Sequence, residues 1–184
     1  TMDIHPAKET TAGESLFLHG EAITLKSVSL DNVLLEETAY EVSETGLTLH
    51  EPPHKPFQLM IENTCDPKNN TTLSGLYHSS GNYCTQCESD GFRRITYYID
   101  RPDVLARFTT TIVADKAHFP YLLSNGNPIE KGEAEGGRHW VKWEDPFPKP
   151  CYLFALVAGD FACIEDSFTT KSGRDVLIQF YVVH

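Results

Sequence analysis

The sequence predicts an all-β protein built from several antiparallel sheets, with at most one or two short helices. Three observations support this prediction. Short apolar and β-branched runs recur along the 184 residues. Turn-forming residues separate them at intervals of roughly 8–12 residues. Only one short segment has a helical signature. Many short strands separated in this way are typical of a sandwich or a set of packed sheets.

The first half of the chain contains five candidate strands. Each is a run of four or more residues in which apolar or β-branched side chains alternate or follow one another. Turn signals separate the runs, among them Asp31-Asn32, Thr45-Gly46 and Pro52-Pro53. The polar stretch 62–74 that follows is expected to be a long loop. The candidate strands cover residues 22–30, 32–35, 39–42, 46–49 and 57–62.

The second half contains four more candidate strands and the only helix candidate. The strand over 152–158 is a nearly continuous apolar run, which predicts burial on both faces. Residues 75–94 combine glycines, aromatics and polar groups, and we expect a loop-like segment there. A helix of about one or two turns is predicted over 101–107, because Asp100 could cap it and Pro102 is tolerated in a first turn. The other candidate strands cover residues 108–114, 140–143 and 176–183.

Composition and charge narrow the classes of function. The chain has 15 basic and 26 acidic residues, for a net charge of −11. Nucleic-acid backbones bind clustered Lys and Arg, so no nucleic-acid partner is expected. The same charge disfavours an anionic membrane surface, and no apolar run approaches the roughly 20 residues of a membrane span. No signal peptide opens the chain, which favours a cytoplasmic protein.

The termini and the length bear on the organisation of the chain. A chain of 184 residues suits a single domain, and we expect residues 1–184 to form one. The chain opens on Thr1 and ends abruptly in an apolar run, at Tyr181-Val182-Val183-His184. We therefore expect it to be a fragment of a longer protein.

The cysteines and histidines do not predict a metal site in this chain. Five thinly spread cysteines do not suggest a disulfide framework, so reduced thiols are expected. Cys84-Thr85-Gln86-Cys87 could be half of a zinc site or a redox pair, but no second ligand pair has suitable spacing. We expect both thiols to be unpaired and unmetallated. None of the eight histidines belongs to a His-Glu-x-x-His motif, and no catalytic residues are predicted here.

A series of linked motifs runs through residues 75–183. These motifs are Gly75–Tyr77, Cys84–Glu88, Phe92–Phe108, Leu122–Asn127, Gly137–Val141, Asp145–Phe161 and Phe168–Arg174. Together they resemble the gluzincin family of zinc aminopeptidases, in its proteobacterial aminopeptidase N branch. Residues 75–183 match closely, whereas residues 1–74 match only in pattern.

The resemblance implies the first, saddle-shaped β domain of a four-domain enzyme, lacking its opening strand or two. The catalytic domain of the same chain would follow residue 184 and would hold the zinc, so this domain alone would be inactive. The family also places a loop of this domain in the substrate site. By resemblance, Glu88 binds the free α-ammonium of the peptide substrate and Gln86 lines the pocket for its first side chain. The resemblance further implies a cis peptide bond between Glu88 and Ser89.

Two other interpretations remain open on the residues alone. The chain could be a free-standing sandwich that binds protein or carbohydrate through Tyr97, Tyr98, Trp140 and Trp143, although such aromatics more often pack in a core. It could also be a thiol or zinc module that uses Cys84 and Cys87. Without the resemblance, Glu88 is simply a solvated carboxylate in a turn.

Overall fold

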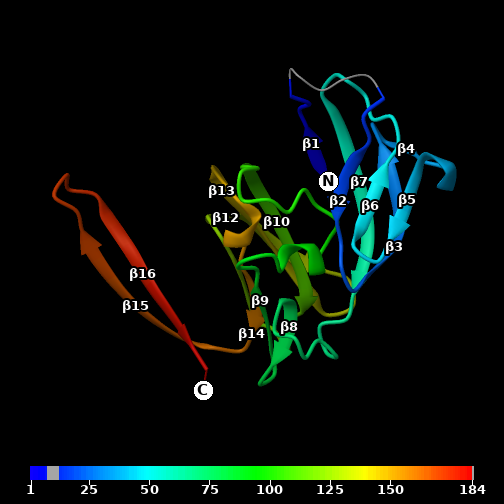
Figure 1. Ribbon diagram of the computed structural model, residues 1–184. Helices are drawn as coiled ribbons and strands as arrows, with labels where there is room; N and C mark the ends of the chain where they lie inside the picture. The colour runs from blue at the N-terminus through cyan, green and yellow to red at the C-terminus, as the bar shows by residue number, and fades with distance from the viewer. Residues whose placement is uncertain (8–12, 184) are drawn as a thin grey trace.

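The computed structural model describes residues 1–7 and 13–183. The described residues form sixteen strands and three 3₁₀ helices of three residues each. The strands pair into five antiparallel sheets, which confirms the predicted all-β class (Figure 1). In the described part of the chain, no helix has the length and apolarity needed to cross a membrane.

The first half of the chain forms two sheets around one core. One sheet has the order β1-β7-β3-β4 and the other the order β2-β6-β5. Their shared core is built from fully buried aliphatic residues, among them Leu18, Leu47 and Leu59, together with Tyr97 from a later segment. The elements are β1 (Met2–Ile4), β2 (Leu16–His19), β3 (Ile23–Leu30), β4 (Val33–Leu34), η1 (Glu37–Ala39), β5 (Tyr40–Ser43), β6 (Gly46–Leu49) and β7 (Phe57–Cys65).

The second half adds two more sheets. One has the order β11-β14-β9-β8 and the other the order β10-β13-β12. Ile112, Leu122 and Ala158 form a small core between them. The elements are β8 (Gly75–Ser79), β9 (Asn82–Gln86), η2 (Phe92–Arg94), β10 (Ala106–Asp115), β11 (Tyr121–Ser124), β12 (Asn127–Ala134), β13 (Arg138–Lys149), η3 (Cys151–Leu153) and β14 (Leu156–Gly159).

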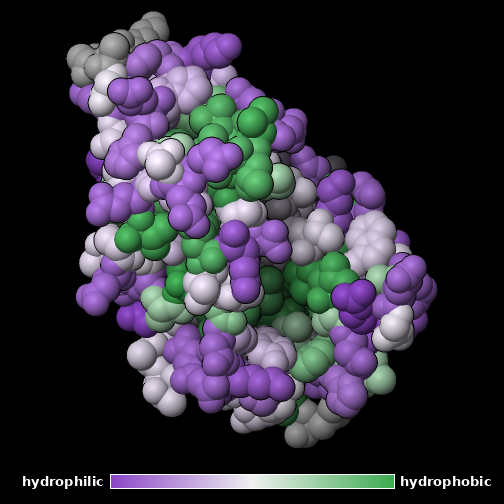
Figure 2. All heavy atoms as spheres, turned by 90° about the vertical axis from the view of Figure 1, so that its right-hand side faces the viewer, coloured by the Kyte–Doolittle hydropathy of each residue, from purple (hydrophilic) through white to green (hydrophobic). Residues whose placement is uncertain are grey.

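The last two strands stand apart from the rest. β15 (Ala162–Thr169) and β16 (Asp175–Val182) pair only with each other and form a separate two-stranded sheet. Figure 1 shows this hairpin projecting from the body of the molecule. On the opposite side, Figure 2 shows apolar patches among polar side chains. Large apolar side chains that are exposed in the N-terminal half include Val33, Leu34 and Met60.

The predicted helix over 101–107 is wrong. Residues 102–103 form a turn, and β10 begins at Ala106. Asp100 does not cap a helix, because its carboxylate accepts hydrogen bonds from Arg93 and Cys151. The next carboxylate, Asp103, pairs with Arg101 across the turn. Both acidic groups are therefore occupied by non-helical partners.

Two further expectations need correction. Residues 75–86, expected to be part of a loop, form the β8–β9 hairpin. The strand predicted over 152–158 begins only at Leu156, after the 3₁₀ turn η3. The Asn125 side chain explains the late start, since it accepts from the backbone N–H of Ala155 at 2.6 Å and donates to the carbonyl of Leu153 at 3.1 Å. The Asn125 side chain thus forms the backbone hydrogen bonds at Leu153 and Ala155 that a neighbouring strand would otherwise form.

The N-terminal core offers a test of the packing. Leu47 is fully buried, whereas its cross-strand partner Val42 is 46% exposed. Leu47→Ala should lower the free energy of unfolding by about 2–5 kcal/mol, because it leaves a cavity in a packed core. Val42→Ala should lower it by less than about 0.5 kcal/mol. Urea unfolding of both variants measures the difference, and equal losses would contradict this description of the core.

Candidate functional site

The β8–β9 hairpin positions the candidate substrate-binding residues. Gly75 at the start of β8 pairs with Gln86 at the end of β9. The other edge of β9 pairs with β14 through Cys84 and Val157. Thr85 adds to this edge, because its hydroxyl accepts from the backbone N–H of Leu156 at 2.9 Å. Since β9 is held on both edges, the loop that follows it starts from a fixed point.

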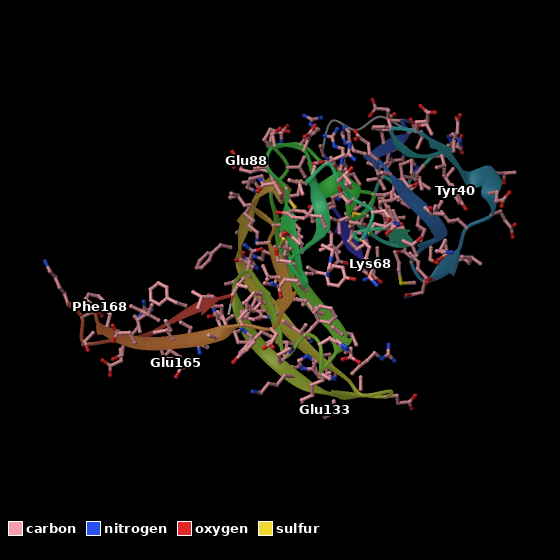
Figure 3. All side chains as sticks on the ribbon, turned by 90° about the horizontal axis from the view of Figure 1, so that it is seen from below. Tyr40, Lys68, Glu88, Glu133, Glu165 and Phe168 are labelled. Carbon is pink, nitrogen blue, oxygen red and sulfur yellow. The ribbon has the colours of Figure 1, made fainter. Side chains whose placement is uncertain are left out.

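The loop after β9 presents two polar side chains and buries the residue between them. Gln86 and Glu88 are exposed, whereas Cys87 is buried. The Gln86 amide donates to the Glu88 carbonyl at 3.3 Å. The peptide bond between Glu88 and Ser89 is cis, as the resemblance implied. Figure 3 shows Glu88 at the rim of the molecule, away from the projecting hairpin that carries Glu165 and Phe168. The structure therefore brings the two predicted residues together.

Gly91 closes this loop against the hairpin. Its N–H donates to the Cys87 carbonyl at 2.8 Å. A Cβ atom at Gly91 would lie 2.3 Å from the Gln86 carbonyl oxygen and 2.8 Å from the Gly75 nitrogen. Both neighbours are backbone atoms that pairing holds in place, so a side chain has no room here. Sequence reasoning singled out Gln86 and Glu88 but gave no role to this glycine.

An aromatic and thiol cluster anchors the loop from below. Cys87, Phe92, Tyr98 and Cys151 are all buried in it. The Phe92 ring meets the Tyr98 ring edge-on, with 5.0 Å between centroids, and the Phe154 ring in the same way at 5.2 Å. Such edge-to-face contacts are favourable beyond their buried area. Cys87 therefore fastens the middle of the loop while its two polar neighbours stay exposed.

A buried ion pair holds the next segment. Asp100 is 6% exposed, and its Oδ2 accepts from Arg93 Nε at 2.8 Å and from the Arg93 backbone N–H at 3.2 Å. Its Oδ1 accepts from Cys151 Sγ at 2.9 Å. A buried carboxylate is costly unless it is paired and hydrogen-bonded, and here both oxygens have donors. The pair fixes η2 against η3.

Arg93 and Arg94 also connect this segment to the N-terminal half. Arg94 forms an ion pair with Glu21 at 3.1 Å, and Arg93 lies 3.6 Å from the same carboxylate. The backbones of His19 and Tyr98 exchange hydrogen bonds at 2.8 and 3.0 Å. The candidate site is thus braced by sheets from both halves of the chain.

The buried cluster keeps its thiols protonated. Burial raises the pKa of the Cys87 thiol to about 12, and the nearby charge of Asp100 acts in the same direction. Burial and the hydrogen bond to Asp100 likewise raise the pKa of Cys151. The thiolate is the reactive form of cysteine, so these thiols are poor nucleophiles and poor metal ligands near neutral pH. Cys84 lies on β9, outside the cluster.

The described residues do not provide a site for a metal ion. Within residues 1–7 and 13–183, no group of three or more His, Cys, Asp and Glu side chains is arranged to hold one. All five cysteines are free. A zinc site therefore cannot be assembled from the described residues.

The aromatic residues of the alternative binding surface are engaged elsewhere. Tyr97 and Tyr98 are buried in two different clusters. The Trp143 indole N–H donates to the Leu122 carbonyl at 3.0 Å, and the Trp140 ring lies against Gly132. These four residues do not form a shared exposed face.

Comparisons with known proteins agree with this fold. The family model "Peptidase M1 N-terminal domain" matches residues 2–153. The chain is 56% identical over 167 residues to aminopeptidase N of Escherichia coli, covering 91% of this chain and 19% of that protein. It is 50% identical over 168 residues to aminopeptidase N of Haemophilus influenzae, with the same coverage of each.

Solved structures show the same similarity. The crystal structure of Legionella pneumophila aminopeptidase A in complex with aspartic acid superposes with a TM-score of 0.90 at 41% identity, covering 96% of this chain and 21% of that one. An M1 zinc metallopeptidase from Deinococcus radiodurans has a TM-score of 0.77 at 15% identity, over 95% of this chain and 40% of that one, which indicates a shared fold. The chain spans about a fifth of the length of the curated aminopeptidase N relatives named above.

The ion pair beneath the loop can be tested by mutation. Asp100→Asn should lower the free energy of unfolding by about 3–5 kcal/mol, because it removes the buried charge that pairs with Arg93 at 2.8 Å and leaves Arg93 only its longer contacts with Glu21 and Asp90. Asp103→Asn is the matched control, since its pair with Arg101 is exposed and screened by solvent, and it should change the free energy of unfolding far less. Urea unfolding of both variants makes the comparison. Similar losses would show that Asp100 does not hold the structure in the way described.

The buried thiols predict a loss of stability at alkaline pH. In the unfolded chain the thiols titrate near their ordinary value of 9.0, whereas in the folded chain Cys87 keeps its proton to about pH 12. Rising pH therefore favours unfolding, and each such thiol lowers the free energy of unfolding by about 1.4 kcal/mol per pH unit above pH 9. Unfolding measured from pH 8 to 10 should show this slope. Cys87→Ala should reduce it, and an unchanged slope in the variant would refute the assignment.

Proposed function

The chain belongs to the family of M1 peptidase N-terminal domains, and from this premise we propose that it forms the substrate-recognition part of a longer zinc aminopeptidase. That enzyme would remove amino-terminal residues from peptides. The observation that carries the proposal is the loop after β9, in which the exposed Glu88 and Gln86 flank a buried anchor. The high identity to aminopeptidase N from two bacteria supports it.

Glu88 provides the means to recognise a free amino terminus. A carboxylate accepts charge-assisted hydrogen bonds from an ammonium group, and these strengthen once the substrate and the rest of the enzyme exclude water. An internal peptide segment offers no such cation and would leave the carboxylate unpaired when the site closes over it. The resulting difference in affinity selects the end of a peptide over its interior. Holding the ammonium also fixes the distance to the first peptide bond, which is a positioning contribution to catalysis.

Gln86 is proposed to line the pocket for the first side chain. Its backbone lies in β9, so the position of its Cα is set by pairing with Gly75. Its amide nitrogen already donates to the Glu88 carbonyl, which orients the amide toward the loop. Gln86 is exposed, so a substrate side chain can reach it.

The rest of the enzyme is proposed to lie in the same polypeptide. Residues 1–184 would form one domain, and the catalytic domain would follow residue 184. The zinc would be held there, since the described residues of this chain do not fit a metal. When bound, it would polarise the substrate carbonyl and activate water. The chain described here would only bind and orient the substrate. We place the enzyme in the cytoplasm, where its five free thiols would stay reduced.

Glu88→Ala in the longer protein tests the proposal. The variant should remain folded, because the Glu88 side chain is exposed. On substrates with a free amino terminus, kcat/KM should fall by an amount that corresponds to about 2–4 kcal/mol of lost transition-state stabilisation. This is the usual cost of removing one partner of a desolvated charge pair. The discrimination against amino-blocked substrates should shrink in parallel.

Asp90→Asn is the matched control for this experiment. Asp90 is an exposed carboxylate two residues further along the same loop, and its nearest cation is Arg93 at 4.0 Å. Removing its charge should leave kcat/KM close to that of the wild type. Wild-type kinetics in the Glu88→Ala enzyme, or equal losses in both variants, would overturn the role proposed for Glu88.

A further inference from the structure

The projecting β15–β16 hairpin has two chemically different faces. Residues directly opposite one another in an antiparallel pair share a face, and successive residues alternate between faces. On one face Ile164 lies opposite Phe180 and Phe168 lies opposite Val176. Ile178 and Val182 continue the same face, which we call the apolar face. On the other face Gln179 donates to Glu165 at 2.6 Å and Thr169 donates to Asp175 at 2.6 Å.

The largest side chains of the apolar face are exposed to solvent in this structure. The side chains of Ile164 and Phe168 are each 59% exposed, and that of Phe180 is 57% exposed. Figure 3 shows the labelled Phe168 near the tip of the hairpin, far from the body of the molecule. A two-stranded hairpin without further packing is at best marginally stable in water. A partner surface would stabilise the hairpin and would also remove its apolar side chains from water.

We propose that the apolar face docks against the polypeptide that follows residue 184 in the longer protein. This inference rests on the proposed function for the existence of that polypeptide, and the length of the aminopeptidase N relatives supports it, since this chain covers only 19% of the relatives from Escherichia coli and Haemophilus influenzae. β16 ends at Val182, at the base of the hairpin, so any continuation begins beside this face. A tethered partner of this kind has a high effective concentration.

The base of the hairpin is already fixed to the body. The Tyr181 ring contacts the Tyr121 ring of β11 edge-on, with 5.2 Å between centroids. Tyr121 in turn lies 6.4 Å from the Phe161 ring, just before β15. The direction in which the hairpin leaves the body is therefore set at its base, while Ile164, Phe168 and Phe180 of the apolar face stay exposed. This arrangement suits a preformed arm that receives a neighbouring domain.

One carboxylate specifies the chemistry of the docking surface. Asp166 lies on the apolar face, opposite Ile178, and its side chain accepts from the next backbone N–H, of Ser167, at 2.8 Å. Covering this carboxylate with apolar atoms alone would bury an unpaired charge, which is costly. The docking surface is therefore apolar with a Lys or Arg side chain placed against Asp166.

Hydrogen–deuterium exchange in the longer protein tests the docking. If the apolar face is covered, the amides of 162–182 should exchange as slowly as those of the β10–β13 pair, because local opening then requires undocking. Phe180→Asp places a charge in the docked surface and should speed exchange in the hairpin by at least about tenfold. Leu177→Asp is the matched control, since Leu177 is 63% exposed on the opposite face, and it should leave exchange unchanged.

The outcomes separate the possible occupants. Fast exchange in the wild-type hairpin, or equal effects of the two variants, would overturn the proposal. Protection that falls on dilution, together with a dimer mass that Phe180→Asp converts to a monomer mass, would assign the face to a second copy and would also overturn it. Peptidase activity is not used as the readout. A protected hairpin in a protein without aminopeptidase activity would therefore refute the proposed function and leave the docking in place.

Discussion

The buried pair between Asp100 and Arg93 is the interaction on which the site depends. Asp100 receives both a side-chain and a backbone hydrogen bond from Arg93, and the Cys151 thiol supplies a donor to its second oxygen. A carboxylate in such a position tolerates little movement, because each lost donor exposes an uncompensated charge to an apolar surrounding. The turns η2 and η3, which are far apart in sequence, are thereby held in one fixed relation.

This constraint explains how a short loop can present a binding group accurately. The loop runs from β9, which is paired on both edges, to η2, which Asp100 fixes. Between these two points Cys87 is buried in the aromatic cluster and Gly91 packs on the Gln86 carbonyl. Glu88 is exposed, but the backbone on each side of it is not free to move. A binding group held in this way loses little conformational entropy when it meets a ligand.

Much of the fold could be predicted from local patterns, but the site could not. The β-branched run at 108–114 and the apolar run at 176–183 both form strands, as their composition indicates. The helix predicted after Asp100 failed because that carboxylate pairs with residues that no local pattern connects to it. The β8–β9 hairpin was missed because its sequence is polar and rich in glycine. Glu88 itself carries no local signal that separates it from a solvated carboxylate, and its role was predicted through resemblance alone.

The exposure of Glu88 and the exposure of the hairpin have one explanation in the proposed enzyme, where a second domain would cover both. A carboxylate facing water attracts an ammonium group weakly, because the high dielectric constant screens the charges. The same pair becomes much stronger once water is excluded from around it. Among the described residues, Glu88 is exposed on a loop that is held at both ends, and the apolar face of the β15–β16 arm is exposed as well. In the proposed enzyme, docking of the arm would bring the second domain against the first. Recognition of the amino terminus would then reach full strength only where the two domains together exclude solvent from Glu88.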